Sequence, residues 1–444
     1  MNETRDLIIG IDFGKEYSQI CYYDRKAEEP RSLPVKVGSS QFEMPTCLCL
    51  RPDRKTYCAG LEAEYFAREK GGFLAGNLYE ISAQNGPVAV GGEKKEAWEL
   101  LAHYLHEMLK LTGIAEVEKN IRSLSIAMDS LNAVQVENLQ RACRELGIPE
   151  ERTILLDYEE SFYYYVLTQK VETWNRSVGW YSFSKDKVVF RKLVMSSGTR
   201  PVGWYSFEQQ KVSFRRMSMN SGTRPVLVHL EEPVTTTLSA KVEERDAEFY
   251  TFIKNTLGKE LYSSIQINGE GFDQEWAQKS VKLLCYQRRK VFYGNNLFAR
   301  GACSAGAERV INHDLKDYRY MSSSLVLSDV GMELRVMGAP AYYPLIESGR
   351  NWYESNAYVE LILDGTKELV FIVDTMGEAK KKRIAMALPG LPERPERTTR
   401  LGVNLQYTSQ DECRVTVKDL GFGEMFPSSG KEWTETTRWQ EETK

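Results

Sequence analysis

Short apolar runs and helically spaced apolar residues alternate along the first two thirds of the chain. Residues 7–12 (LIIGID) and 123–128 (SLSIAM) are continuous apolar runs, which predict buried strands. Residues 97–111 (AWELLAHYLHEMLKL) place apolar side chains three and four positions apart, which predicts an amphipathic helix. Another helix is predicted over 130–148, with Ser130 as its N-cap. Alternating strands and helices indicate an α/β fold.

The pattern changes after about residue 320. Strand-like runs separated by turns then dominate, as in LILDGTKELVFIV (361–373) and RLGVNLQYTSQDECRVTVKDL (400–420). This change predicts a separate all-β domain. The polar residues 431–444 are expected to form a loose tail.

One segment occurs twice in tandem. Residues 178–202 read VGWYSFSKDKVVFRKLVMSSGTRPV, and residues 202–226 read VGWYSFEQQKVSFRRMSMNSGTRPV. Each copy predicts a strand, a turn and a strand, with Trp180 and Trp204 at equivalent positions 24 residues apart. Three interpretations remain open: the extra hairpin extends the sheet of its lobe, it presents an aromatic edge to a partner, or it is a duplication that the fold only accommodates.

Composition and charge exclude several classes of protein. The 444 residues carry a net charge of −4, so no basic field predicts nucleic-acid binding. No apolar run approaches the roughly 18–20 residues of a membrane span, and the N-terminus lacks the features of a signal peptide. Most of the eight cysteines lie in apolar runs, which is typical of buried free thiols in a reducing cytoplasm. The spacing of Cys47, Cys49 and Cys58 does not fit a common zinc site.

Several motifs, in their order along the chain, resemble those of the DnaK-type (70-kilodalton heat-shock) chaperones of the actin-like ATPase superfamily. IGIDFGKEYSQICYYD (9–24) resembles the first phosphate loop, and INGEGF (267–272) resembles the adenosine loop. NNLFARGACSAGA (295–307) resembles a helix that crosses between lobes, and SLVLSDVGMEL (324–334) resembles the interdomain linker. Residues 388–424 resemble the last strands of the peptide-binding sandwich. The chain looks like a divergent, lidless member, of a bacterial family of unknown function.

This resemblance implies a two-lobed actin-like ATPase fold with ribonuclease-H-like lobes, followed by an all-β sandwich. The implied parts follow one another along the chain. They are lobe I at 1–172, lobe II at 173–312 with the duplicated hairpin at 178–226, a linker at 313–330, the sandwich at 331–430 and the tail at 431–444.

The implied nucleotide site begins in the first phosphate loop, at Asp12, Phe13, Gly14 and Lys15. Glycine allows the backbone to approach an anion, and Asp12 could hold Mg²⁺ through water. Lys15 could contact a phosphate as a point charge. The alternative is that Gly14 only makes a hairpin turn, which Asp12 caps.

The implied adenosine loop contains Gly269, Glu270, Gly271 and Phe272, with Phe272 stacking on the base. The alternative is a strand-to-helix turn that needs glycine for its backbone angles.

Two parts of the resemblance fail. The second phosphate hairpin falls on the duplicated segment, where Ser182 and Ser206 replace the metal-binding aspartate and no glycine lies in the turn. Tyr158 stands where the catalytic glutamate would align, and Glu159 follows it. No strong catalytic candidate remains, and Asp12 and Glu159 are weak ones. The sequence therefore favours a protein that is not an enzyme.

Three functions compete. The favoured one is a cytoplasmic chaperone-like protein that binds protein or extended apolar peptide clients through its β-sandwich, with a degenerate nucleotide-binding domain. The second is a slow ATPase of the same type, and the third is a structural protein that assembles like actin. ATP or ADP with magnesium is the implied cofactor, and the degenerate motifs allow that none binds. The sequence names neither the client nor any co-chaperone.

Overall fold

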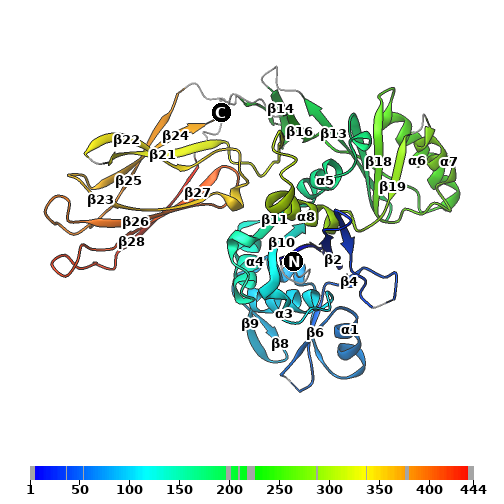
Figure 1. Ribbon diagram of the computed structural model, residues 1–444, viewed down its shortest axis with the longest axis horizontal. Coiled ribbons are helices and arrows are strands. Elements are labelled where there is room, and N and C mark those ends of the chain that lie inside the picture. The colour runs from blue at the N-terminus through cyan, green and yellow to red at the C-terminus, as the bar shows by residue number, and fades with distance from the viewer. Residues whose placement is uncertain are drawn as a thin grey trace. The chain divides into compact units, whose positions relative to one another are not determined.

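The chain forms two compact units. A computed structural model describes residues 6–438 except 37, 54, 197–201, 209–210, 218–225, 287–288, 337 and 376–379 (Figure 1). One unit consists of Met1–Ser197 and Pro225–Met321, and the other consists of Gly198–Arg224 and Ser322–Lys444. The first unit is mixed α/β and contains two large sheets, which define lobe I and lobe II below.

The sheet of lobe I has the order β11-β10-β1-β2-β3, with β4 paired to β2. Strands β1, β10 and β11 run parallel, whereas β2 and β3 are antiparallel to their neighbours. The apolar runs predicted as strands are confirmed as β1 and β10. The bounds are β1 Leu7–Phe13, β2 Tyr17–Asp24, β3 Glu29–Ser32, β4 Met44–Pro45, β10 Ile121–Met128 and β11 Thr153–Asp157.

The sheet of lobe II has the order β19-β18-β12-β13-β16-β20, with β17 paired to β13. Strand β12 is parallel to β18, which is parallel to β19, and β13 is antiparallel to both β12 and β16. The bounds are β12 Ser177–Ser184, β13 Lys187–Ser196, β16 Val226–Leu230, β17 Val234–Thr237, β18 Tyr262–Glu270, β19 Lys290–Tyr293 and β20 Tyr318–Tyr320.

The two sheets repeat one arrangement. In each sheet, three strands lie side by side in chain order, each antiparallel to the next. On its other side, the first of these three is flanked by two strands parallel to it. The order β3-β2-β1-β10-β11 therefore corresponds to β16-β13-β12-β18-β19. The hairpin β12–β13 therefore has the same place in lobe II that β1–β2 has in lobe I.

The remaining elements of lobe I are helices and two further small sheets, with the orders β6-β5-β7 and β8-β9. Helix α3 confirms the predicted amphipathic helix. Helix α4 is capped by Asn132, whose side chain accepts from the Gln135 N–H at 2.9 Å, and not by Ser130 as predicted. The bounds are β5 Leu48–Leu50, β6 Tyr57–Ala59, β7 Phe73–Ala75, β8 Pro87–Val90, β9 Glu93–Glu96, α1 Gly60–Glu69, α2 Leu78–Ser82, α3 Ala97–Lys110, η1 Val117–Asn120, α4 Ala133–Glu145, η2 Glu150–Arg152 and η3 Val171–Thr173.

Helices α5 (Tyr158–Leu167) and α8 (Leu297–Ala307) lie between the two sheets (Figure 1). One buried cluster joins their side chains to strands of both lobes, from Ile154 of β11 to Val178 of β12. Helix α8 is followed by the π-helix η5 (Glu308–Asn312).

Glycines let these helices pack at backbone distance. A Cβ added at Gly301 of α8 would lie 2.1 Å from the carbonyl oxygen of Ser161 on α5. A Cβ added at Gly10 of β1 would lie 2.2 Å from the backbone nitrogen of Cys303 on α8. No side chain fits at either position unless the backbone moves.

Helices α6 (Val242–Leu257) and α7 (Gln278–Leu284) belong to lobe II. Side chains of α6 pack on the sheet in a second buried cluster, which includes Phe249 and Tyr181. Both copies of the duplicated segment are hairpins, as predicted, but the second copy, which was expected in lobe II, falls in the second unit. The second copy forms β14 (Val202–Glu208) and β15 (Lys211–Met217), which pair only with each other among the described residues.

The second unit is all-β. Besides the hairpin β14–β15, it contains two antiparallel four-stranded sheets, with the orders β22-β21-β24-β25 and β23-β26-β27-β28. Buried and exposed residues alternate along β26 and β27, so their sheet buries one face, as in a two-layer sandwich. The bounds are β21 Ser328–Val336, β22 Ala339–Ile346, η6 Trp352–Glu354, β23 Asn356–Ile362, β24 Glu368–Thr375, β25 Lys382–Ala387, β26 Arg400–Tyr407, β27 Glu412–Asp419 and β28 Glu432–Arg438.

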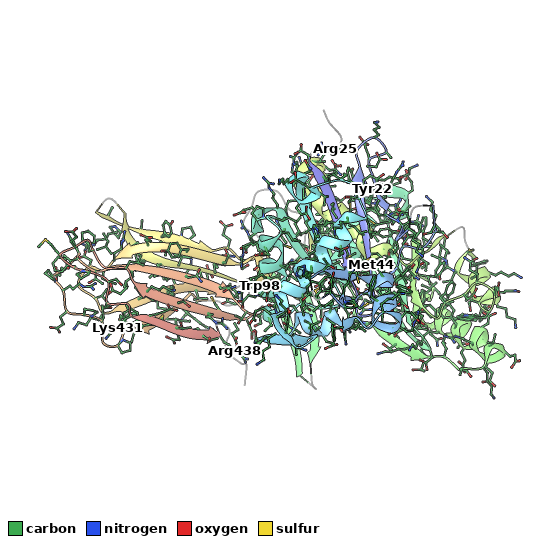
Figure 2. All side chains as sticks on the ribbon, turned by 90° about the horizontal axis from the view of Figure 1, so that it is seen from below. Tyr22, Arg25, Met44, Trp98, Lys431 and Arg438 are labelled. Atoms are coloured by element: carbon green, nitrogen blue, oxygen red, sulfur yellow. The ribbon has the colours of Figure 1, made fainter. Side chains whose placement is uncertain are left out.

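Two expected boundaries differ from the structure. The expected linker at 313–330 contains β20, which pairs with β16 of lobe II, and the start of β21. Val326 is fully buried and exchanges backbone hydrogen bonds with Gly349 and Arg350. The expected tail begins with β28, an edge strand that starts one residue after Lys431 and ends at Arg438 (Figure 2).

None of the helices in the described ranges combines the length and the apolar character that a membrane crossing needs.

The close approach of α8 to α5 gives a stability prediction. Gly301→Ala should destabilise the first unit by about 2 kcal/mol or more, because its Cβ meets backbone that cannot rotate away. The control is Gly294→Ala, whose Cβ would have its nearest neighbour, Asn296 Oδ1, at 3.5 Å and should change stability by about 0.5 kcal/mol or less. Urea unfolding measures both, and equal stabilities of the two variants would contradict the prediction.

Candidate functional site

The hairpin β1–β2 brings the predicted phosphate-loop residues to the carboxyl edge of the lobe I sheet. Asp12 lies opposite Gln19 in the strand pair, just before the turn. A Cβ added at Gly14 would lie 2.3 Å from the carbonyl oxygen of Tyr17, so the tight hairpin itself requires glycine. The structure thus supports the turn interpretation of Gly14, and it leaves a ligand role untested.

Asp12 is buried, with 7% of its surface exposed. Its carboxylate accepts a hydrogen bond of 2.6 Å from the Tyr158 Oη. Burial raises the pKa of Asp12 to about 7, the hydrogen bond from Tyr158 opposes that rise, and the negative charge of Asp129 adds to it. Mg²⁺ binds the ionised form of a carboxyl group, so near neutral pH it would have to compete with the proton on Asp12.

Tyr158 is the first residue of α5, which begins after the cap Asp157. Its ring stacks on Phe298 of α8, with ring centres 3.7 Å apart and planes 1° apart. Burial and the neighbouring Asp12 carboxylate raise the pKa of Tyr158 well above its usual value, so the phenol stays a donor. The two crossing helices therefore fix a phenol directly over Asp12.

Glu159, the second catalytic candidate, has a different partner. Its carboxylate pairs with Arg191 of β13, with Nε and Oε1 3.0 Å apart. The Arg191 guanidinium lies over the Trp180 ring at 5.1 Å, and the indole N–H of Trp180 donates to Asn268 at 2.7 Å. Glu159 thus joins α5 to lobe II through Arg191.

The side chains of Lys15 and Phe13 have different environments: that of Lys15 is exposed and forms an ion pair, and that of Phe13 is buried. The Lys15 ammonium pairs with Asp129 at 2.8 Å and lies 5.3 Å from the centre of the Tyr79 ring. The hydrogen bond to Asp129 raises the pKa of Lys15. The Phe13 ring is fully buried against Tyr79 and Tyr104, so it belongs to the core of lobe I and only its backbone could reach a ligand.

The predicted adenosine loop packs against the first duplicated hairpin. Gly269 and Gly271 have φ angles of 97° and 109°, and a Cβ on them would lie 2.0 Å from the Phe183 carbonyl oxygen and 2.1 Å from that of Lys185. Phe272 is 6% exposed, in the aromatic core of lobe II. These contacts account for both glycines, and they leave the Phe272 ring no open face for a base.

Glu270 lies at the end of β18 with an exposed side chain, and its carbonyl oxygen accepts from the Lys185 N–H at 2.8 Å. The turn Lys185–Asp186 corresponds to the second phosphate loop of the resemblance. The Arg245 guanidinium donates to the Lys185 carbonyl, and the Asp186 carbonyl accepts from the Leu238 N–H at 2.8 Å. This turn therefore uses its backbone groups within the protein rather than around an anion.

Asp129 is a site residue that the motifs did not single out. It directly follows β10, while Asp12 and Asp157 lie at the ends of β1 and β11. The carboxyl ends of parallel strands lie at the same edge of a sheet. An aspartate at or just after the end of each predicted strand could therefore have indicated that the three carboxylates lie close together.

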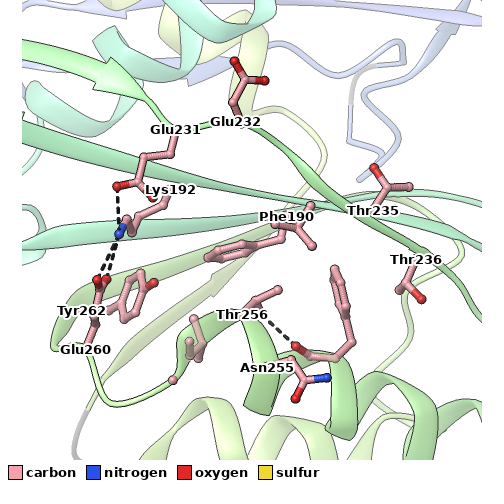
Figure 3. Close-up of a pocket in the computed structure, with 14 residues that line it drawn as sticks. Phe190, Lys192, Glu231, Glu232, Thr235, Thr236, Asn255, Thr256, Glu260 and Tyr262 are labelled. Carbon is pink, nitrogen blue, oxygen red and sulfur yellow. Dashed lines mark hydrogen bonds and ion pairs between the residues drawn. The ribbon is translucent and has the colours of Figure 1, made fainter. Parts of the chain in front are cut away.

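A pocket of about 450 Å³ lies elsewhere in lobe II (Figure 3). Phe190 and Tyr262 form part of its wall, and the Lys192 ammonium lies 2.9 Å from carboxylate oxygens of both Glu231 and Glu260. None of the predicted site residues lines this pocket.

Metal ligands do not gather in the described part of the chain. Cys47, Cys49 and Cys58 lie together in a buried cluster, but no three His, Cys, Asp or Glu side chains among the described residues are arranged to hold a metal ion.

Two family models match the chain. The model described as "Family of unknown function (DUF5716) C-terminal" matches residues 29–202 and 199–323, and the model described as "Domain of unknown function (DUF8552)" matches residues 325–439. The border between the two models falls close to the border between the two structural units at Met321 and Ser322. No curated protein shows significant similarity to the chain.

The raised pKa of Asp12 gives a pH dependence. Between about pH 4 and 7 the unfolded chain ionises Asp12 while the folded chain keeps the proton, so the contribution of Asp12 to stability falls as the pH rises. The free energy of unfolding of the wild type relative to Asp12→Asn should fall by on the order of 2 kcal/mol between pH 5 and 7.

Urea unfolding at several pH values measures this difference. Asp186→Asn, at an exposed turn position, is the control and should track the wild type. A pH-independent difference between the wild type and Asp12→Asn would contradict the assignment.

Proposed function

The chain belongs to the family of unknown function DUF5716, and we propose that it is a chaperone-like protein that binds protein or extended apolar peptide segments and does not hydrolyse ATP. The first unit is then a degenerate actin-like ATPase domain, and the second unit is the client-binding domain.

The repeated strand order supports the actin-like assignment. Both sheets of the first unit have three antiparallel strands followed by two parallel ones, as two related lobes would have. Helices α5 and α8 pack between these sheets, where the resemblance expects the crossing helices. The family matches carry no activity of their own, so the function rests on the chemistry of the site.

The contact between Tyr158 and Asp12 carries the proposal. Phosphoryl transfer needs a metal, the γ-phosphate and a water molecule held in line, and most of the catalysis is this positioning. Here the central carboxylate is buried, bonded to a phenol at 2.6 Å and protonated up to about neutral pH. Glu159, the other catalytic candidate of the resemblance, is paired with Arg191.

Two edge strands of the second unit support peptide binding. Strand β22 pairs only with β21, and β23 only with β26, in the described residues. Tyr342 on β22 is 46% exposed, and Tyr358 on β23 is 61% exposed. An extended peptide can bond to the free backbone groups of the β23 edge and place apolar side chains against exposed rings. Strand β22 contains Pro340 and Pro344, which have no N–H, so it offers mainly its exposed ring.

The proposal predicts no ATP turnover. Steady-state phosphate release from the purified full-length chain with ATP and magnesium should stay at background, and Asp12→Ala should not change it. Phosphate release that Asp12→Ala abolishes would favour the slow ATPase instead.

The proposal also predicts which residues bind the client. Tyr342→Asp combined with Tyr358→Asp should weaken the binding of fluorescent apolar peptides to the full-length chain by about fivefold or more, because both exposed rings are replaced by charge. Thr436→Asp on the polar edge strand β28 is the control. Absence of peptide binding by the wild type, or equal binding by all three proteins, would contradict the assignment of these edges.

A further inference from the structure

The two duplicated hairpins have the same strand register. In the first copy Trp180 lies opposite Arg191, and in the second copy Trp204 lies opposite Arg215. Every pair of the first copy from Val178 to Ser184 has its equivalent 24 residues later. The first copy is nevertheless the one in the seven-stranded sheet, whereas the second forms a sheet of its own.

The second copy keeps the side chains that the first copy buries. Seven hydrophobic side chains of β12 and β13 are buried: Val178, Trp180, Tyr181, Phe183, Val188, Phe190 and Leu193. The equivalent residues of the second copy are Val202, Trp204, Tyr205, Phe207, Val212, Phe214 and Met217, so six are identical and the seventh is another apolar residue of similar volume.

The second copy also keeps the polar groups that bond to the rest of lobe I and lobe II. Trp180 donates to Asn268, Tyr181 bonds Thr256 at 2.6 Å, and Arg191 pairs with Glu159. The second copy has tryptophan, tyrosine and arginine at these positions. It has Arg216 at the position of Lys192, which keeps the positive charge between the two glutamates of the pocket (Figure 3).

The copies differ at eight positions, three of which are consecutive at the exposed turn, and the other five are residues 189, 192, 193, 194 and 196 of the first copy. Ser184, Lys185 and Asp186 of the first copy are all exposed, and the second copy has Glu208, Gln209 and Gln210 there. The family match divides into two pieces that overlap at residues 199–202, where the first copy ends and the second begins.

We propose that the two hairpins are interchangeable occupants of one place in the lobe II sheet. Lobe II then has two states: the observed one, with β12–β13 in the sheet, and an exchanged one, with β14–β15 in the sheet and the first copy excluded.

The cost of excluding a copy is similar in the two states. In the observed state the excluded repeat of 24 residues follows β13, and in the exchanged state it precedes β14. The excluded loop has the same length in both, so the entropy of loop closure hardly distinguishes the two states. The sequence of the turn does distinguish them. Asp186 is of a residue type that tight turns favour, whereas its counterpart Gln210 is not. The turn therefore favours the observed state.

A charge in the core of one copy tests the exchange. Tyr181 is fully buried, so Tyr181→Asp excludes the first copy from the sheet, and Tyr205→Asp is its matched equivalent in the second. Each single variant should keep a cooperative melt, with Tyr181→Asp within about 5 °C of the wild type. The double variant should lose the melt of the first unit.

Hydrogen exchange followed by mass spectrometry shows which copy is in the sheet. Wild type should protect residues 177–196, and Tyr181→Asp should transfer the protection to residues 202–217. The proposal is overturned if Tyr181→Asp melts like the double variant, or if it stays folded with its protection still in the first copy. It is also overturned if Tyr205→Asp alone abolishes the melt.

A deletion of residues 179–202 provides a second variant without a buried charge. It joins Val178 to Gly203 in phase and leaves a single hairpin made almost entirely of the second copy. A cooperative melt with protection of that hairpin supports interchange, and loss of the melt contradicts it.

Discussion

The close approach of helix α8 to strand β1 and helix α5 is the constraint on which the first unit depends. Gly10 and Gly301 bring backbone against backbone at both contacts. The helix is therefore held between the sheets at a fixed depth, and Phe298 at its start supports the ring of Tyr158. The same packing that joins the lobes thus holds a phenol on Asp12, where a phosphate-binding enzyme would need an ionised, accessible carboxylate.

The candidate site consequently has structural bonds where the family resemblance implies ligand contacts. Asp12 bonds Tyr158, Glu159 pairs with Arg191, and the turn at Lys185 bonds Glu270. Each bond connects elements that, according to the resemblance, a nucleotide would bridge. An unliganded domain stabilised in this way suits a binding protein, and it also explains how lobe II accommodates a duplicated hairpin that would disturb a working phosphate site.

Local pattern was sufficient to predict much of the fold, because buried strands such as β10 and the amphipathic helix α3 are periodic in sequence. It failed where a tertiary contact decides. The apolar side chain of Val326 fits an interdomain linker as well as the core of a β-sandwich. The ring of Phe272 fits base stacking as well as burial in a core, and the structure buries both side chains. The partners of Asp12 could not be read locally, since Tyr158 lies 146 residues away along the chain. The aspartates after parallel strands were the readable part of the site.

Calorimetric titration of the full-length chain with ATP, with and without magnesium, tests the central claim that Tyr158 occupies the Asp12 carboxylate and that no magnesium–nucleotide site forms there. At about 1 mM ATP a site with even millimolar affinity would be half filled. The account predicts that magnesium makes no difference to the heats of the wild type or of Asp12→Asn. Stoichiometric binding that requires magnesium and disappears in Asp12→Asn would contradict it.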